Sequence, residues 1–219
     1  MGARALQGLN TRFVVAMGGV PEWERPVRVL GVDPGSRFMG YGVVEERRGR
    51  LTHVGHGVIK VDPDAPLPHR LMVLHAELTG VLSKFRPEAV SVEGVFTFRN
   101  ARSALVLGHA RGVALLAAAQ KGLPVFEYPP ARVKRSVGAG GADGKDSVAR
   151  MVCALLHLEA IERADASDAL AVALCHLNQG RAAGLMVGTS RSARSKSRKG
   201  AAALLADRLS PSYRRPEAR

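Results

Sequence analysis

The sequence predicts an α/β fold in which a mixed five-stranded sheet is flanked by helices. Three apolar segments separated only by turns open the folded region, which is typical of an antiparallel meander. Helical segments then alternate with two further short apolar segments, which is typical of strands joined by helical crossovers. The chain has 219 residues, 46% of them hydrophobic, so it suits one domain with a core of ordinary size.

The meander begins with VRVLGVD (residues 27–33), a segment rich in Val and Leu that is closed by the turn-forming Pro34-Gly35-Ser36. Two further strands, GYGVVEER (40–47) and RLTHVGHGVIKV (50–61), are joined by Arg48-Gly49. Three prolines between positions 63 and 68 then interrupt the chain. We therefore expect these three strands to be sequential neighbours in the sheet.

Two helical crossovers follow the meander. Apolar residues recur at helical spacing from His69 to Phe85, and Arg86-Pro87 ends that helix. AVSVEG is the fourth strand and finishes at Glu93. Asn100 is the expected N-cap of a second helix that stops at Lys121-Gly122, and LPVFEY (123–128) is the fifth strand.

The rest of the folded region is helical. PARVKRSV (130–137) is a short helical turn, GAGGADG (138–144) is a glycine-rich loop, and two helices end the domain. These helices, KDSVARMVCALLHL and DASDALAVALCHLNQ, carry Cys153 and Cys175. No apolar run approaches the roughly 20 residues of a membrane helix, and FVVAM near the N-terminus is shorter than the roughly 7–15 residues of a signal sequence. We therefore expect a cytoplasmic protein that binds no membrane and whose cysteines are buried, reduced thiols.

The charge is unevenly spread. Residues 181–219 hold 10 Lys and Arg against 2 acids, which gives +8 of the total net charge of +13. Residues 1–26 contribute +1, and residues 27–180 contribute +4. We predict an N-terminal extension (1–26), a folded domain (27–180) and a basic, disordered tail (181–219), because the tail has too little apolar area to order itself. Such a tail favours non-specific attraction of phosphate.

Four acids stand where they can meet at one edge of the sheet. Asp33 and Glu93 end predicted strands, and Asp165 and Asp168 are three residues apart on one helical face. Each has a structural alternative: a turn former, a solvated strand end, or a helix cap with a first-turn acid. A carboxylate cluster in a basic protein instead favours hard divalent cations. Two Mg²⁺ ions about 4 Å apart would suit phosphodiester hydrolysis, and no zinc or Walker motif is present in the sequence.

These residues lie in segments that resemble the RuvC family of Holliday junction resolvases. The segments are VLGVDPGSRFMGYGVV, SVEGVFTFRNARSALVLGHARGVALLAA, VFEYPPARVKRSVGAGGADGK and ADASDALAVALCH, within residues 27–179. The resemblance implies a ribonuclease H-like fold, a homodimer, and an endonuclease that needs Mg²⁺ or Mn²⁺. It implies symmetric nicking of two opposing strands of four-way DNA junctions during recombination and repair, which leaves 5′-phosphates. RuvA and RuvB are the partners that it implies.

The resemblance also assigns roles to residues. Asp33, Glu93, Asp165 and Asp168 match the family's metal-binding catalytic acids, although some members have His at the third of these positions. Neither residues 1–26 nor the tail has a counterpart in the family pattern.

Five further residues match or flank positions that meet DNA in the family. Phe96 matches an aromatic residue that stacks on a base at the opened junction centre, and a core Phe is its alternative. Lys134 and Lys145 match lysines near the active site, with generic surface lysines as the alternative. Arg99 and Arg102 flank Phe96 and are weaker candidates for backbone contacts.

Gly108 and Gly112, four residues apart, allow a close helix contact either within the subunit or across a dimer seam. Three other functions remain open at this point. They are an actin-like ATPase or sugar kinase, a junction-binding protein that does not cut, and a nuclease of RNA–DNA hybrids.

Overall fold

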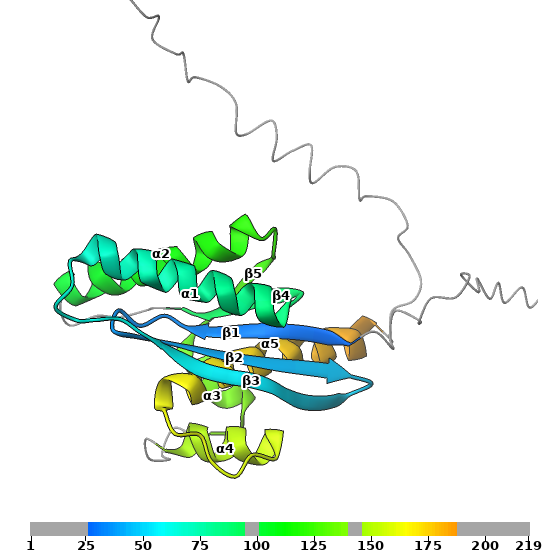
Figure 1. Ribbon diagram of the computed structural model, residues 1–219. Coiled ribbons are helices and arrows are strands. Elements are labelled where there is room, and N and C mark those ends of the chain that lie inside the picture. The colour runs from blue at the N-terminus through cyan, green and yellow to red at the C-terminus, as the bar shows by residue number, and fades with distance from the viewer. Residues whose placement is uncertain (1–25, 95–100, 140–145, 188–219) are drawn as a thin grey trace, which may run out of the picture. The chain divides into compact units, whose positions relative to one another are not determined.

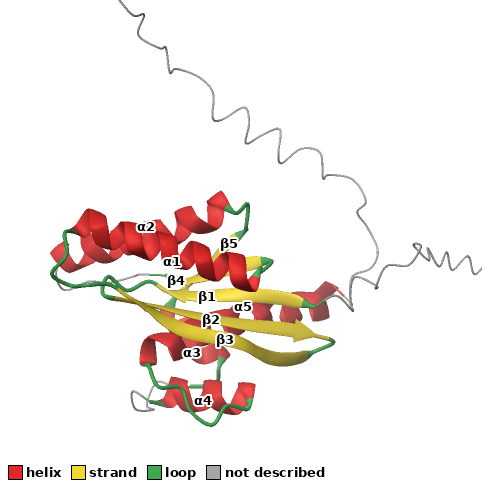
Figure 2. Cartoon of the chain, in the orientation of Figure 1, coloured by secondary structure: helices red, strands yellow, loops and turns green. Residues whose placement is uncertain are grey.

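The computed structural model describes residues 26–94, 101–139 and 146–187. The predicted order of elements is confirmed, and a mixed five-stranded sheet lies between two layers of helices (Figures 1 and 2). The strands are β1 (Val27–Asp33), β2 (Phe38–Arg47), β3 (Arg50–Lys60), β4 (Ala89–Glu93) and β5 (Val125–Tyr128). The helices are α1 (Leu67–Phe85), α2 (Ala101–Gln120), α3 (Pro130–Ser136), α4 (Ser147–Leu156) and α5 (Ala164–Val187).

The sheet has the strand order β3-β2-β1-β4-β5. The meander pairs antiparallel, whereas β4 and β5 run parallel to β1 because a helix carries the chain back before each of them. Strands β1, β3, β4 and β5 run in the same direction, so their carboxyl ends lie along one edge of the sheet, the edge that crosses the strand ends. The first residue of β2, Phe38, lies at the same edge.

Side chains alternate between the two faces of the sheet. Leu30 and Val32 of β1 pack into a core with Leu74 and Leu78 of α1 and with alanines of α2. Val29 faces the opposite way, into a core that contains most of the buried part of α5. Asp33 has the same parity as Val29, so the first acid lies on the face that α5 covers.

Small residues let α5 approach the sheet closely. Gly31 lies opposite Gly42 on β2 and next to Ser91 on β4. A Cβ atom on Gly31 would lie 1.9 Å from the carbonyl oxygen of Ala169 in α5, and one on Gly42 would lie 2.6 Å from Leu170. Neither position has room for a side chain, so the helix rests against the backbone of the sheet.

β3 contains a β-bulge opposite the step between Val43 and Val44 of β2. The bulge adds one residue to β3, so His53 and His56 share a face although they are three residues apart. Their rings are linked by a 2.8 Å hydrogen bond between Nε2 of His53 and Nδ1 of His56.

Several details differ from the sequence expectations. β2 begins at Phe38 instead of Gly40, and β5 begins at Val125 instead of Leu123. α5 continues to Val187 instead of ending at Gln179, because Gly180 costs a helix interior only about 1 kcal/mol and the next residues are good helix formers. Cys175 is buried as expected, but Cys153 is partly exposed; both are free thiols. Ser103–Gln120 in α2 is long and apolar enough to span a membrane by length and composition, although the sequence has no long uninterrupted apolar run.

Candidate active site

The site is built where β1 and β4 end beneath the first turns of α5. Asp33 and Glu93 are the last residues of their strands, and the residues just before them, Val32 and Val92, pair in register. The two carboxyl groups therefore project from neighbouring strand ends. The burial of β1 and β4 on both faces fixes their position, because neither strand can slide without exposing apolar side chains.

Gly40 sets the position of α5 relative to these strand ends. It lies opposite Asp33 in the sheet, and a Cβ atom on Gly40 would lie 1.9 Å from the backbone oxygen of Asp165. This contact brings the first turn of α5 directly over the end of β1. Asp165 and Asp168, one turn apart on that helix, are thus carried to the same site as the strand-end acids.

Burial and mutual repulsion disfavour the ionised forms of these acids. The pKa of Asp33 is raised from 3.8 to about 7. Burial is the largest cause, followed by the negative charges of Glu93, Asp168 and Asp165 in that order. Asp33 therefore keeps its proton to a much higher pH than an ordinary aspartate. Carboxyl groups with a strongly raised pKa are concentrated at functional sites of proteins.

Two of the other acids respond in the same way. Burial raises the pKa of Glu93, and Asp168 raises it further. Burial also raises the pKa of Asp168, with Asp165 as the second cause. The ammonium group of Lys134 opposes both shifts, although its side chain is exposed on α3. The four predicted acids and Lys134 therefore form one electrostatically coupled group.

The donor set of the site is four carboxylates, which suits a hard cation with oxygen ligands. In the described ranges, no three His, Cys, Asp or Glu side chains are arranged so that they could hold a metal ion as they stand. The acids are thus close enough to repel one another but not converged. A cation would remove the repulsion and draw the carboxylates together, so the residues fit a metal whose binding is coupled to side-chain movement.

Arg163 and Phe38 belong to the site although sequence reasoning did not single them out. The guanidinium of Arg163 donates to Asp165 Oδ2 at 2.9 Å and lies 4.1 Å from the ring centroid of Phe38. Phe38 is 36% exposed, so part of its ring is open to solvent at this end of the sheet. The signal available in the sequence was an Arg two residues before an acid, which is too common to be informative.

The loop after Asp33 is held by a second arginine. Arg70 of α1 donates a hydrogen bond to the backbone oxygen of Ser36. Because this loop connects the end of β1 to Phe38 at the start of β2, Arg70 ties α1 to the edge of the sheet that carries the acids.

The remaining predicted residues are placed only in part. Lys134 lies in α3 as described above. Phe96, Arg99 and Lys145 lie outside the described residues, as does the expected cap Asn100. Arg102 lies in the first turn of α2, but its side chain is not described.

The fold and the coupled carboxylates define a ribonuclease H-like nuclease. The particular family follows from comparison with known proteins. The family model for RuvC, crossover junction endodeoxyribonuclease, matches residues 29–176. The chain belongs to the RuvC family and is a crossover junction endodeoxyribonuclease, a nuclease of Holliday junction resolution whose family is metal-dependent.

Individual relatives agree with this assignment. The crossover junction endodeoxyribonuclease RuvC of Myxococcus xanthus is 76% identical over 195 residues, which cover 88% of this chain and 100% of the relative. The corresponding protein of Trichlorobacter lovleyi is 48% identical and covers 77% of this chain and 97% of its own length. Both relatives are matched over nearly their whole length.

Solved structures show the same fold. T. thermophilus RuvC in complex with a Holliday junction substrate matches with a TM-score of 0.65 and 37% identity, over 71% of this chain and 96% of that one. A yeast mitochondrial Holliday junction resolvase matches with a TM-score of 0.51 and 17% identity over 69% of this chain and 78% of that one. At that identity the yeast protein supports the fold alone. The sequence-based expectations of fold, family and enzymatic class are confirmed.

Proposed function

We propose that this chain resolves four-way DNA junctions with two Mg²⁺ ions held by Asp33, Glu93, Asp165 and Asp168, and that Mn²⁺ can replace Mg²⁺. The observation that carries the proposal is the mutual repulsion of these partly buried carboxyl groups in a chain of net charge +13. When bound, the ions would neutralise charge at phosphorus and supply an activated water. The product ends are expected to be 5′-phosphates at symmetric nicks.

The chain's own residues have distinct tasks in this proposal. Asp33 must lose its proton before it can serve as a ligand, so ionisation of this carboxyl and ion binding are linked. Lys134, whose positive charge acts on both Glu93 and Asp168, is placed to neutralise a phosphate that enters the site. Lys145 is proposed for the same task on the strength of the family resemblance.

Contacts with the junction itself are proposed for residues before and at the start of α2. Phe96 stacks on a base at the opened junction centre, and Arg99 and Arg102 contact the backbone nearby. An aromatic wedge compensates for lost base stacking, whereas arginines add affinity without reading sequence.

We further propose that the chain is a homodimer joined through α2. The exposed residues Leu105, Gly108, His109, Gly112 and Leu116 are spaced so that they share one face of this helix. Leu105 and Leu116 are 66% and 52% exposed, and a Cβ atom on either glycine would have nothing within 4 Å. This apolar stripe of small and large residues suits close packing with the same helix of a second subunit, and two subunits would match the two cutting positions of a junction.

The dimer also explains the apolar composition of Ser103–Gln120 without a membrane, since only 22% of that stretch is buried within one subunit. Cooperation with RuvA and RuvB and a cytoplasmic location are expectations of the same assignment. Residues 181–219, with a net charge of +8, are proposed to add salt-sensitive affinity for DNA outside the nuclease domain of residues 27–180; residues 1–26 are proposed to form a separate extension.

The test is cleavage of a mobile four-way junction with Mg²⁺, with a linear duplex and an RNA–DNA hybrid as controls. Wild type should give paired symmetric nicks in the junction, and Asp33→Asn should bind the junction but not cut it. If Asp33→Asn also fails to bind, the proposed separation of metal centre and DNA affinity is wrong. Cutting of the hybrid alone would contradict the proposed substrate.

A further inference from the structure

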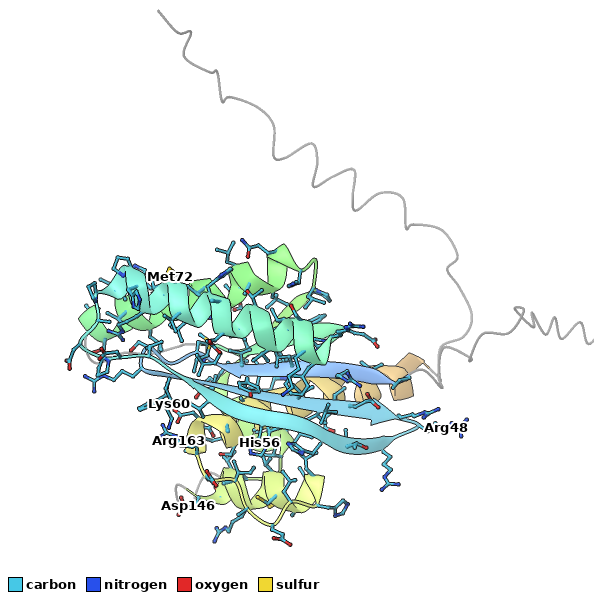
Figure 3. The ribbon with its side chains drawn as sticks, viewed as in Figure 1. Arg48, His56, Lys60, Met72, Asp146 and Arg163 are labelled. Carbon is cyan, nitrogen blue, oxygen red and sulfur yellow. The ribbon has the colours of Figure 1, made fainter. Side chains whose placement is uncertain are left out.

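A pocket lies beside the acid cluster, between β3 and the segment that leads into α5. Its volume is about 500 Å³, and the side chains of β3 that line it come from the face that α5 covers. Figure 3 shows His56, Lys60 and Arg163 gathered on this side of the sheet. The lining residues are His56, Gly57, Val58, Lys60, Ala160, Glu162, Arg163 and Ala166.

The pocket lies at the same edge of the sheet as the proposed metal ligands. Val58 lies opposite Gly40, which in turn lies opposite Asp33. With strands about 4.8 Å apart, Val58 is about 10 Å from Asp33 across the sheet. Lys60 is two residues further along β3, toward the edge where β1 and β4 end. A DNA strand whose scissile phosphate is at the acids can therefore reach the pocket with a phosphate only a nucleotide or two away.

The charges in the pocket favour an anion. Lys60 is exposed, and Arg163 lines the pocket while its Nη2 donates a hydrogen bond to Asp165. A guanidinium has five N–H donors in a fixed plane, so binding Asp165 leaves others for a second acceptor. The ring of Phe38 holds that plane in place at no cost in donors. Glu162 is the one acid among the lining residues, against the two cations Lys60 and Arg163.

The negative charge of the acid cluster gives a physical reason for a cationic pocket beside it. Four carboxylates repel every phosphate that approaches, and metal ions held by them would neutralise that repulsion at the scissile phosphate. A neighbouring phosphate still lies within about one Debye length, 8–10 Å, of the same acids. Cations one or two strand widths away offset this repulsion and hold the strand in register for attack.

We propose that this pocket, the β3–α5 pocket, binds a backbone phosphodiester of the uncut junction strand next to the scissile phosphate, with Lys60 and Arg163 as its cationic ligands. The proposal rests on the junction as substrate but not on the identity or number of the metal ions. Lys60 is the residue that tests it, because Arg163 also contacts Asp165 and its loss would disturb the acid cluster.

The experiment measures junction affinity in an Asp33→Asn background, with and without Lys60→Ala, over a range of salt concentrations. Arg50→Ala is the matched control: Arg50 is also exposed and lies at the opposite end of β3, about 33 Å away. Lys60→Ala should weaken binding about 3- to 10-fold and reduce the slope of log affinity against log salt by about 1. Arg50→Ala should leave both within error; an equal effect of the two variants would overturn the proposal.

A second measurement locates the phosphate. Junctions that carry one neutral methylphosphonate, placed one to three positions on either side of the scissile phosphate, are compared in the two proteins. At one position the neutral linkage should weaken binding to the Lys60 protein about as much as Lys60→Ala does, and should have no further effect on the Lys60→Ala protein. Additive effects at every position would overturn the proposal, as would an effect of Lys60→Ala confined to nicked product with a terminal 5′-phosphate.

These outcomes are separate from those of the cleavage test. If Asp33→Asn still cuts, the proposed metal site fails whatever Lys60 does. If the cleavage test succeeds and Lys60 behaves like Arg50, the β3–α5 pocket alone is refuted.

Discussion

The two faces of the sheet are packed in different ways. On the face covered by α1 and α2, large side chains such as Leu30, Leu74 and Leu78 separate helix from sheet. On the face covered by α5, Gly31 brings the backbone of β1 against the backbone of Ala169, and Gly42 leaves room only for Leu170. Cores filled by side chains can repack after a substitution, whereas backbone pressed on backbone cannot. The acids belong to the second face, where their positions are least free to vary.

The largest effect is expected from a side chain added between α5 and the sheet. Gly40→Ala should destabilise the protein by about 3–5 kcal/mol and abolish cutting, because its Cβ would lie 1.9 Å from the backbone oxygen of Asp165. Thermal unfolding and the junction cleavage assay measure the two effects. Gly80→Ala in α1 is the control, because a Cβ atom there meets nothing within 4 Å. If the two variants are equally stable, α5 is not held rigidly against the sheet.

The second effect concerns the negative charge of Asp33 on the face of the sheet that α5 covers. The pKa of Asp33 is raised from 3.8 to about 7, so the folded state favours the protonated carboxyl. This contribution to stability is present below about pH 4 and is lost as pH rises through about 7. Asp33→Asn should therefore stabilise the metal-free protein at pH 8 by about 1–3 kcal/mol and have little effect at pH 4. Chemical unfolding of both proteins at the two pH values measures this difference.

The same unfolding measurement with added Mg²⁺ tests whether the ion relieves the repulsion among the acids. It should stabilise wild type at pH 8 and stabilise Asp33→Asn much less, because the variant has lost both a ligand and the repulsion that the ion relieves. Glu77→Gln, which changes an exposed acid of α1, should follow wild type throughout. Stabilisation of all three proteins by the same amount would place the ion elsewhere.

A smaller effect is expected from Arg163 and Phe38, which lie beside the acids. Arg163→Ala should lower the cutting rate at saturating junction about 3- to 10-fold, because the Asp165 carboxylate loses the partner that orients it. Phe38→Ala should lower it less, about 2- to 3-fold, and Phe38→Tyr should restore it because the stacked ring is retained. Single-turnover kinetics measure these rates. An unchanged rate with Phe38→Ala would show that the stacking does not position Arg163.

The smallest effect tests the outer surface of the other helical layer. Gly112→Ala should raise monomer stability by up to about 1 kcal/mol, because alanine favours a helix and the position is open. The same methyl group should weaken the proposed dimer, since it lies on the stripe between Leu105 and Leu116. Sedimentation equilibrium and thermal unfolding at low concentration separate the two results. A stronger or unchanged dimer would place the seam on another surface.

The sequence by itself determined the order of elements, which is confirmed, and it singled out the four acids as a candidate site. Both depend on local patterns: alternating or continuous apolar runs define strands, helical spacing defines α1, and a carboxylate at a strand end remains there whatever packs around it. The ends of elements were misjudged in places, as at Val187 of α5 and at Phe38 of β2. One glycine is a weak stop signal for a helix when the residues after it favour the helix.

Only the tertiary structure decided how close the acids lie and what surrounds them. The contact of Gly40 with Asp165, the stacking of Arg163 on Phe38, and the β3–α5 pocket each join segments at least 100 residues apart. No local pattern encodes such contacts, since they depend on strand register, the bulge in β3 and the docking of α5 on glycines. The sequence therefore specifies which groups are available, whereas packing determines their distances and, with these, their pKa values.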